Sequence, residues 1–298
     1  MVSQLSYREQ APVPALWQVP LARALPYKDS RLTMPVNKPL RTLHECVMTL
    51  LTLLELPVND DGLRQRVKTF ILCNGFDGVY RAARFTAIRG NHEPNIIAEP
   101  WSYTVRVYNG NLARLNYLYT LSHWAESGLR SQLDLHYTVT LGETWPRDPR
   151  RYLDGREVNS FLQATRNLLP WEQVPGVPMM QVSDAITSTE FLERISLSWL
   201  KQMVLKIHGG DARRILVGQD GRTINYQRAK SLLEAAVTIR NAVAHNRYLT
   251  NEVYTKGEQN LLDLLAILHF DVAKALRNLE IERTPLIRQA IQRLDDIP

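Results

Sequence analysis

The sequence predicts a mainly α-helical fold, a bundle of several helices, from three observations. Apolar residues recur at three- and four-residue spacing through most of the chain after residue 40. Strand and helix patterns do not alternate, and no internal repeat is visible. The 298 residues, 45% hydrophobic and 22% charged, have the composition of a globular protein, which excludes collagen, coiled-coil, disulfide-scaffold and disordered classes.

The N-terminal elements follow from proline and capping patterns. Six prolines within residues 1–39 predict an extended arm, because proline interrupts a helix ladder. Residues 40–56 predict a helix that ends before Pro57, and Asn59–Asp61 supply N-caps for a second helix that ends near Gly75. A third helix closes at Gly90. Residues 101–107 alternate aromatic or β-branched with polar side chains and suggest a short strand.

The middle of the chain contains the longest periodic segment, residues 111–141, which predicts a helix ended by Gly142. The segment 145–156 is rich in proline and arginine and is interpreted as a solvated loop, with phosphate contact by Arg147, Arg150 and Arg151 as the less favoured alternative. After a helix near 157–168, residues 170–180 hold three prolines and a glycine and predict the main linker.

The C-terminal part predicts a helix from Ser183 or Asp184 to Gly209, a small β-hairpin near 213–225, and amphipathic helices over 226–249 and 256–279. A short helix is expected after Pro285. The predicted organisation is therefore an arm (1–39), an N-terminal helical region (40–180) and a C-terminal helical domain (181–298).

Charge and cysteine content indicate a cellular location but do not identify a binding partner. The net charge of +6 is spread evenly over the two halves, so neither half is a basic tail. Cys46 and Cys73 are the only cysteines, and they lie in apolar stretches without a metal or disulfide pattern. We therefore expect a cytoplasmic protein with no exported leader and no membrane span.

The chemistry expected at a site depends on the histidines. Phosphate-loop, HExxH and G-x-S-x-G motifs are absent from the sequence, and no two of the seven histidines are four residues apart. We therefore expect neither a metal nor a cofactor. The segment IRNAVAHNRY is distinctive because it groups Arg240, Asn241 and His245 in an otherwise aliphatic helix.

A helical wheel separates these three residues from the apolar stripe of Leu232, Ala236, Ile239 and Val243. Asn241 and His245 lie nearly opposite that stripe, Arg240 lies on its flank, and Ala242 and Ala244 leave room for another surface. An imidazole can transfer protons and a guanidinium can hold a phosphate, so the group suits attack of an RNA 2′-hydroxyl on its adjacent phosphate. A two-fold dimer would supply a second His and a second Arg.

The spacing of Arg240, Asn241 and His245 resembles the R-x4-6-H motif of the HEPN superfamily. The segments LRTLHECVMTLLTLLEL, CNGFDGVYRAARF, SGLRSQLDLHYTVTLGETW and IRNAVAHNRYL occur in an order similar to that of Abi-like abortive-infection proteins of the AbiD/AbiF type. The likeness covers most of residues 40–280. It implies a HEPN-type four-helix-bundle core near the C-terminus, a metal-independent endoribonuclease acting as a toxin or antiphage effector, and Arg240, Asn241 and His245 as its active site.

The resemblance also implies partners and accessory residues. The expected partners are an RNA substrate and a second copy of the chain, docked through the helix that bears Arg240 and His245, with an antitoxin or a small RNA as a further candidate. Arg130 and His136 match a recurring segment of the family, although a structural role for them is favoured. Arg247 is a weak candidate for RNA contact.

Two other interpretations stay open. The domain could be a catalytically inactive HEPN-like module that binds RNA or a protein, with Arg240 in a structural ion pair. Alternatively, Asn241 and His245 could be ordinary exposed residues of a bundle.

Overall fold

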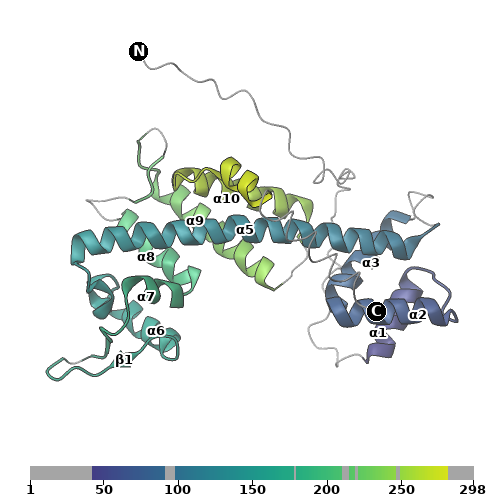
Figure 1. The fold of residues 1–298 in the computed structure, drawn as a ribbon, viewed down its shortest axis with the longest axis horizontal. Coiled ribbons are helices and arrows are strands. Elements are labelled where there is room, and N and C mark those ends of the chain that lie inside the picture. The colour runs from purple at the N-terminus through teal and green to yellow at the C-terminus, as the bar shows by residue number, and fades with distance from the viewer. Residues whose placement is uncertain are drawn as a thin grey trace, which may run out of the picture. The chain divides into compact units, whose positions relative to one another are not determined.

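The computed structural model describes residues 42–90, 98–177, 179–209, 215–218, 221–245 and 249–280, and most of these residues are helical, as predicted. The chain divides into two compact units, Met1–Arg114 and Leu115–Pro298, each with its own hydrophobic core. The division falls within helix α5 (Pro100–Leu141) and so differs from the boundary expected at residue 180 (Figure 1). The expected N-terminal arm lies outside the described residues.

The first unit contains the three predicted helices, α1 (Leu43–Leu53), α2 (Asp61–Asn74) and α3 (Phe76–Gly90). Thr42 and Glu45 form a capping box at the start of α1, and the Asp60 carboxylate accepts the backbone N–H of Leu63 at the start of α2. Gly75 ends α2 with a φ of 78°, a conformation that favours glycine. Local capping residues therefore set these boundaries, as the sequence predicts.

The strand predicted over 101–107 is wrong, because these residues begin α5. Thr104 and Tyr108, four residues apart, are both buried, which is the spacing of a helix face. The Thr104 hydroxyl donates to the Pro100 carbonyl at 2.9 Å, so its polar group is satisfied within the helix. The alternation of Trp101, Tyr103 and Val105 with polar residues is thus coincidental. The predicted end at Gly142, with φ of 88°, is confirmed.

The segment after α5 is more ordered than predicted. Two short 3-10 turns, η3 (Trp145–Arg147) and η4 (Pro149–Arg151), precede α6 (Gly155–Thr165). The Trp145 side chain is fully buried, so the arginine-rich loop is anchored in the core. The expected linker instead forms an antiparallel hairpin of β1 (Trp171–Glu172) and β2 (Gln181–Val182), because the turn-forming prolines and glycine connect two pairing segments.

The helices after β2 differ from prediction mainly in their breaks. The single helix expected from Ser183 is α7 (Ser188–Arg194) followed by α8 (Leu197–Gly209), separated where Ile195 takes an extended backbone. A single bridge between Val217 and Thr223 marks the predicted hairpin.

The two long C-terminal helices are α9 (Tyr226–Ala244) and α10 (Asn251–Ile267). A further helix covers 272–280 after His269, whose φ is 58°. The helix expected after Pro285 lies outside the described residues. Within the described ranges, no helix is both long and apolar enough to cross a membrane.

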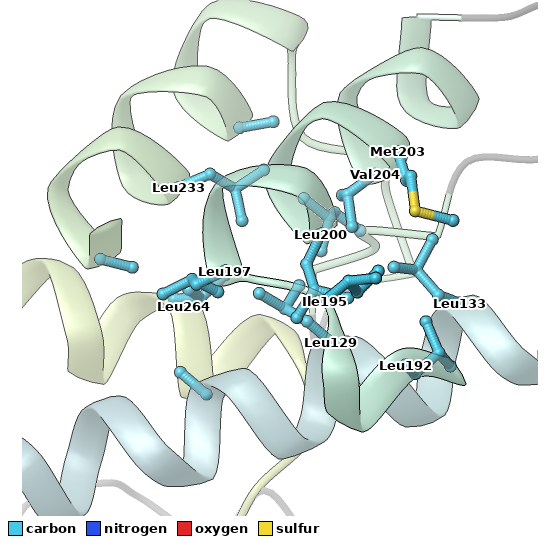
Figure 2. Close-up of a cluster of buried hydrophobic side chains, with 14 of the residues drawn as sticks. Leu129, Leu133, Leu192, Ile195, Leu197, Leu200, Met203, Val204, Leu233 and Leu264 are labelled. Atoms are coloured by element: carbon cyan, nitrogen blue, oxygen red, sulfur yellow. The ribbon is translucent and has the colours of Figure 1, made fainter. Parts of the chain in front are cut away.

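The core of the second unit brings five helices together around aliphatic side chains. Figure 2 shows Leu129 and Leu133 of α5, Leu192 of α7, Leu200 of α8, Leu233 of α9 and Leu264 of α10 in one cluster. All six are at most 2% exposed. Packing of this kind fixes which face of α9 turns inward, and so which face carries polar residues.

Candidate functional site

The candidate site lies on α9, which packs against both α8 and α10. The helix begins at the N-cap Asn225, whose side chain accepts the backbone N–H of Arg228 at 2.8 Å. Its buried face is aliphatic and consists of Ala229, Leu232, Leu233, Ala236, Ile239 and Ala242. Only the remaining face is free to carry polar groups.

Arg240, Asn241 and His245 are all exposed at the C-terminal end of α9. Asn241 and His245 are four residues apart, which places them within about 40° of each other and about 6 Å apart along the axis. Arg240 is about 140° from His245 around the same axis, so the two side chains leave the helix on different sides. Asn241 and His245 form a ridge, with Arg240 beside it.

The end of α9 provides the electrostatic setting of this ridge. His245 is the C-cap residue, and its backbone N–H donates to the Asn241 carbonyl at 3.1 Å. The last carbonyls of a helix carry partial negative charge, which favours a cationic side chain nearby. Across the described residues, no hydrogen bond, ion pair or ring contact involves the Arg240, Asn241 or His245 side chain. All three are therefore available to a ligand.

The predicted stripe on α9 is largely confirmed, with one correction. Leu232, Ala236 and Ile239 are buried, and Val243 packs against the same core while partly exposed. Ala242 was expected to leave room beside the ridge, but it is only 7% exposed and belongs to the core. On the helical wheel Ala242 lies at the edge of the stripe. Because α8 and α10 both pack against α9, the buried face is wide enough to include it. Ala244 is exposed and keeps the expected role.

Arg130 and His136, the accessory candidates, lie on α5 and do not point to a common place. They are six residues apart, or about 120° around the helix. The Arg130 side chain, 19% exposed, forms an ion pair with Glu126 and donates to the Ile195 carbonyl at 3.4 Å. His136 is half-buried, with its ring centroid 5.4 Å from that of Tyr137. Neither residue forms a hydrogen bond or an ion pair with the Arg240, Asn241 or His245 side chain.

The three arginines expected as weak RNA contacts each have an intramolecular partner. Arg147 pairs with Asp184 at 3.3 Å, and Arg151 donates to the Leu141 carbonyl at 2.8 Å, where it caps the end of α5. Arg150 donates to both carboxylate oxygens of Asp148, and this hydrogen bonding lowers the pKa of that carboxyl. Their charge is thus partly neutralised within the fold. Arg247, the fourth candidate, lies outside the described residues.

Some interacting residues were not identified from the sequence. Glu126 was not singled out, although its position four residues before Arg130 on a helix is the usual spacing of an intrahelical ion pair. The contact between Arg89 of α3 and Tyr103 of α5 is also new, and no sequence signal indicated it, because the two residues are fourteen apart in different helices.

Metal-binding clusters were also sought. Within the described ranges, no group of three or more His, Cys, Asp and Glu side chains is arranged to hold a metal ion.

Comparison of the chain with protein-family models, with curated proteins and with solved structures finds no match.

Proposed function

We propose that the protein is a metal-independent endoribonuclease of HEPN type, which acts in the cytoplasm as a toxin or antiphage abortive-infection effector. The observation that carries the proposal is the exposed ridge of Asn241 and His245 beside Arg240, without intramolecular partners among the described residues. The HEPN-type four-helix core implied by the sequence resemblance is part of the same proposal, with α8, α9 and α10 as three of its helices.

In the proposed reaction, the RNA 2′-oxygen attacks the adjacent phosphorus and the bond from phosphorus to the 5′-oxygen breaks. One imidazole accepts the 2′-hydroxyl proton, and a second imidazolium protonates the leaving 5′-oxygen. The products are a 2′,3′-cyclic phosphate and a 5′-hydroxyl. Arg240 offsets the charge that develops on the non-bridging oxygens, and Asn241 orients the phosphate or the imidazole.

A homodimer supplies the second proton-transfer group that this reaction requires. One chain carries a single His245, and its Arg240 leaves α9 about 140° away. Two-fold apposition of two α9 ridges would place Arg240 of one protomer beside the imidazole of the other. RNA is therefore one proposed partner, and a second copy of the chain is the other.

The alternative function is an inactive helical module that binds RNA or a protein partner. It is favoured by one observation, that a single chain presents only one imidazole on the ridge. This alternative also expects a structural ion pair of Arg240, but Arg240 forms no ion pair with any residue that the structure describes.

The proposal is tested by RNA cleavage in excess EDTA. Wild type, His245→Ala and Arg240→Ala are incubated with single-stranded and structured RNA, and products are analysed for a 2′,3′-cyclic phosphate. The exposed residues His44 and Arg66 give the matched controls His44→Ala and Arg66→Ala. We expect wild type and both controls to cleave, and both α9 variants to lose at least about a hundredfold in rate. Binding without product supports the alternative, and equal activity of His245→Ala refutes the catalytic role.

A further inference from the structure

Helix α5 carries a row of exposed residues along the part that belongs to the second unit. The row follows the four-residue spacing of a helix ridge, and we call it the outer row of α5, defined as Tyr119, His123, Ser127, Ser131 and Leu135. Tyr119 is 55% exposed and Leu135 is 63% exposed. The outer row therefore has a large side chain at each end and small side chains at its middle.

The outer row lies opposite the core along its whole length. The core residues of α5 follow the same four-residue spacing, each two positions after a residue of the outer row: Leu121, Ala125, Leu129, Leu133 and Tyr137. A shift of two residues corresponds to about 200° around the helix, so each residue of the outer row leaves α5 on the side away from the core. The core covers one ridge of α5, and the opposite ridge stays exposed.

The outer row contains no Asp, Glu, Lys or Arg. Within residues 115–141, these residue types occur only at Glu126, Arg130 and Asp134, and each of them is at least partly buried. Glu126 pairs with Arg130, and the Asp134 carboxylate accepts the indole N–H of Trp145 at 3.3 Å. RNA is a poor occupant of the outer row, because binding to phosphates depends on Lys and Arg side chains.

The side chains of the outer row are prepared for contact with another protein surface. The Ser131 hydroxyl donates to the Ser127 carbonyl at 3.1 Å, so covering this hydroxyl leaves no donor unpaired. The rings of Tyr119 and His123 are stacked, with centroids 6.4 Å apart and 9° between their planes. Because these two rings are already ordered, docking against them costs little further side-chain entropy.

The order of side-chain sizes suits the crossing of two identical helices. Four-residue ridges of two helices pack at about −50°, so the axes are closest at one point and diverge on both sides of it. A two-fold axis at Ser127 would bring this residue against its own copy, with His123 facing Ser131. Tyr119 would then face Leu135 of the second copy. The small serines lie where the helices are closest, and the large side chains lie where the gap widens.

We propose that the outer row of α5 binds the outer row of a second copy of the chain, with the two helices antiparallel and crossing at Ser127. The symmetry of the sizes about this one residue favours a second copy over an unrelated protein. A membrane surface is a poorer occupant, because it requires a continuous apolar face and the middle of the outer row is polar. A single helix crossing is at the small end of specific interfaces, around 1,000 Å², so a dissociation constant on the order of micromolar is expected.

This contact goes beyond the proposed function, because it uses no residue of α9 and requires no cleavage. Two different two-fold interfaces in one chain join dimers into larger assemblies. The α5 contact therefore predicts an assembly larger than a dimer wherever the α9 contact also forms. Either contact can fail while the other holds.

The test is a disulfide that only this geometry favours. Ser127→Cys is introduced together with Cys73→Ser, which removes the exposed native thiol, while the buried Cys46 stays in place. Two cysteines can be bridged only if their Cα atoms lie within about 7 Å, which the crossing point allows. The matched control is Ser160→Cys in the same background, because Ser160 is also exposed on a helix and its hydroxyl also donates to a carbonyl four residues earlier. Circular dichroism checks that the variants are folded.

We expect Ser127→Cys to form a disulfide-linked dimer at least about ten times faster than Ser160→Cys under mild oxidation at micromolar concentrations. Adding Leu135→Lys should remove this excess, because each copy would bury an unpaired ammonium group at the contact. Leu168→Lys, at a 50%-exposed position outside α5, should change little. Equal cross-linking of Ser127→Cys and Ser160→Cys overturns the proposal.

Sedimentation velocity measures the same contact without introduced cysteines. Leu135→Lys should raise the concentration required for self-association by at least about tenfold, and Leu168→Lys should not. A monomeric wild type, or unchanged self-association in Leu135→Lys, overturns the proposal. RNA cleavage by a chain that shows no excess cross-linking at residue 127 refutes the α5 contact and leaves the proposed function standing. The cross-link in a chain that cleaves no RNA supports the contact and refutes only the endoribonuclease.

Discussion

Gly257 of α10 lies directly against the Ile239 side chain of α9, which would have to shift to admit a larger residue at position 257. A Cβ atom on residue 257 would come 2.8 Å from Cγ1 of Ile239 and closer still to its Cδ1. The glycine therefore permits a close approach of the two helices beside Ile239, which directly precedes Arg240 and is fewer than two turns from His245. The helix crossing and the ridge of Asn241 and His245 therefore lie on the same helix, so a change in packing at the crossing can alter the position of the ridge.

Replacement of Gly257 by Ala should destabilise the fold by about 1–2 kcal/mol, since overpacking a buried crossing outweighs the better helix propensity of Ala. Urea unfolding followed by circular dichroism measures the change. Ile239→Val removes the nearer clashing carbon, so the double variant should be less destabilised than the sum of the single variants. Strict additivity of the two changes would contradict the proposed contact.

Arg130 should prove structural, because it pairs with Glu126 and both side chains are mostly buried. Arg130→Ala leaves the Glu126 side chain, 14% exposed, without its cation, and we expect a loss of about 2 kcal/mol in unfolding free energy. Glu126→Ala/Arg130→Ala should be more stable than the sum of its single variants predicts, because neither charge is left alone. Loss of RNA cleavage by Arg130→Ala with unchanged stability would instead place Arg130 in the site.

The parts of the fold that could be predicted from the sequence depend on local chemistry. Asp60, Gly75 and Gly142 act through hydrogen bonds or backbone conformations within a few residues, so the helix ends that they set were predicted correctly. The start of α5 was missed because aromatic residues such as Trp101 and Tyr103 alternate with polar residues by chance, which is the pattern of a strand. Only the burial of Thr104 reveals that this segment has a helical face.

Contacts between distant segments could not be predicted in this way. The pairing of β1 with β2 and the contact of Arg89 with Tyr103 depend on how segments meet in space. At the candidate site, the helical wheel placed Asn241 and His245 on the exposed face of α9, whereas the burial of Ala242 required knowledge of how widely α9 is enclosed. That these residues catalyse a reaction stays a prediction.

Acid should weaken the fold through its carboxylate caps. The Asp154 carboxylate accepts the backbone N–H groups of Glu157 and Arg156 at 3.0 and 3.1 Å, and these bonds lower its pKa below the ordinary value of 3.8. Because the pKa of Asp154 is lower in the folded state, its contribution to stability is complete above the unfolded-state value of 3.8 and is lost as the pH falls through the folded-state pKa.

Asp154→Asn keeps an N-cap but cannot titrate, so its unfolding free energy should approach that of wild type as the pH falls below 3.8. Urea unfolding across this range measures the convergence. Glu193→Gln, on an exposed face of α7, provides a control that should keep the pH dependence of wild type. A wild-type pH dependence in Asp154→Asn would show that this cap does not contribute.

Mixing of wild type with an inactive variant should suppress activity if each active site needs the imidazoles of both protomers. A dimer of one wild-type chain and one His245→Ala chain holds a single His245, so it lacks one of the two proton-transfer groups of the proposed reaction. With random exchange in an equimolar mixture, about a quarter of the dimers are fully wild type, so we expect about a quarter of the cleavage given by the same total amount of wild type. A site confined to one chain instead gives about half, because every wild-type chain stays active. Exchange of subunits is verified by mass measurement of differently tagged chains, and verified exchange with about half of the activity would refute the shared site.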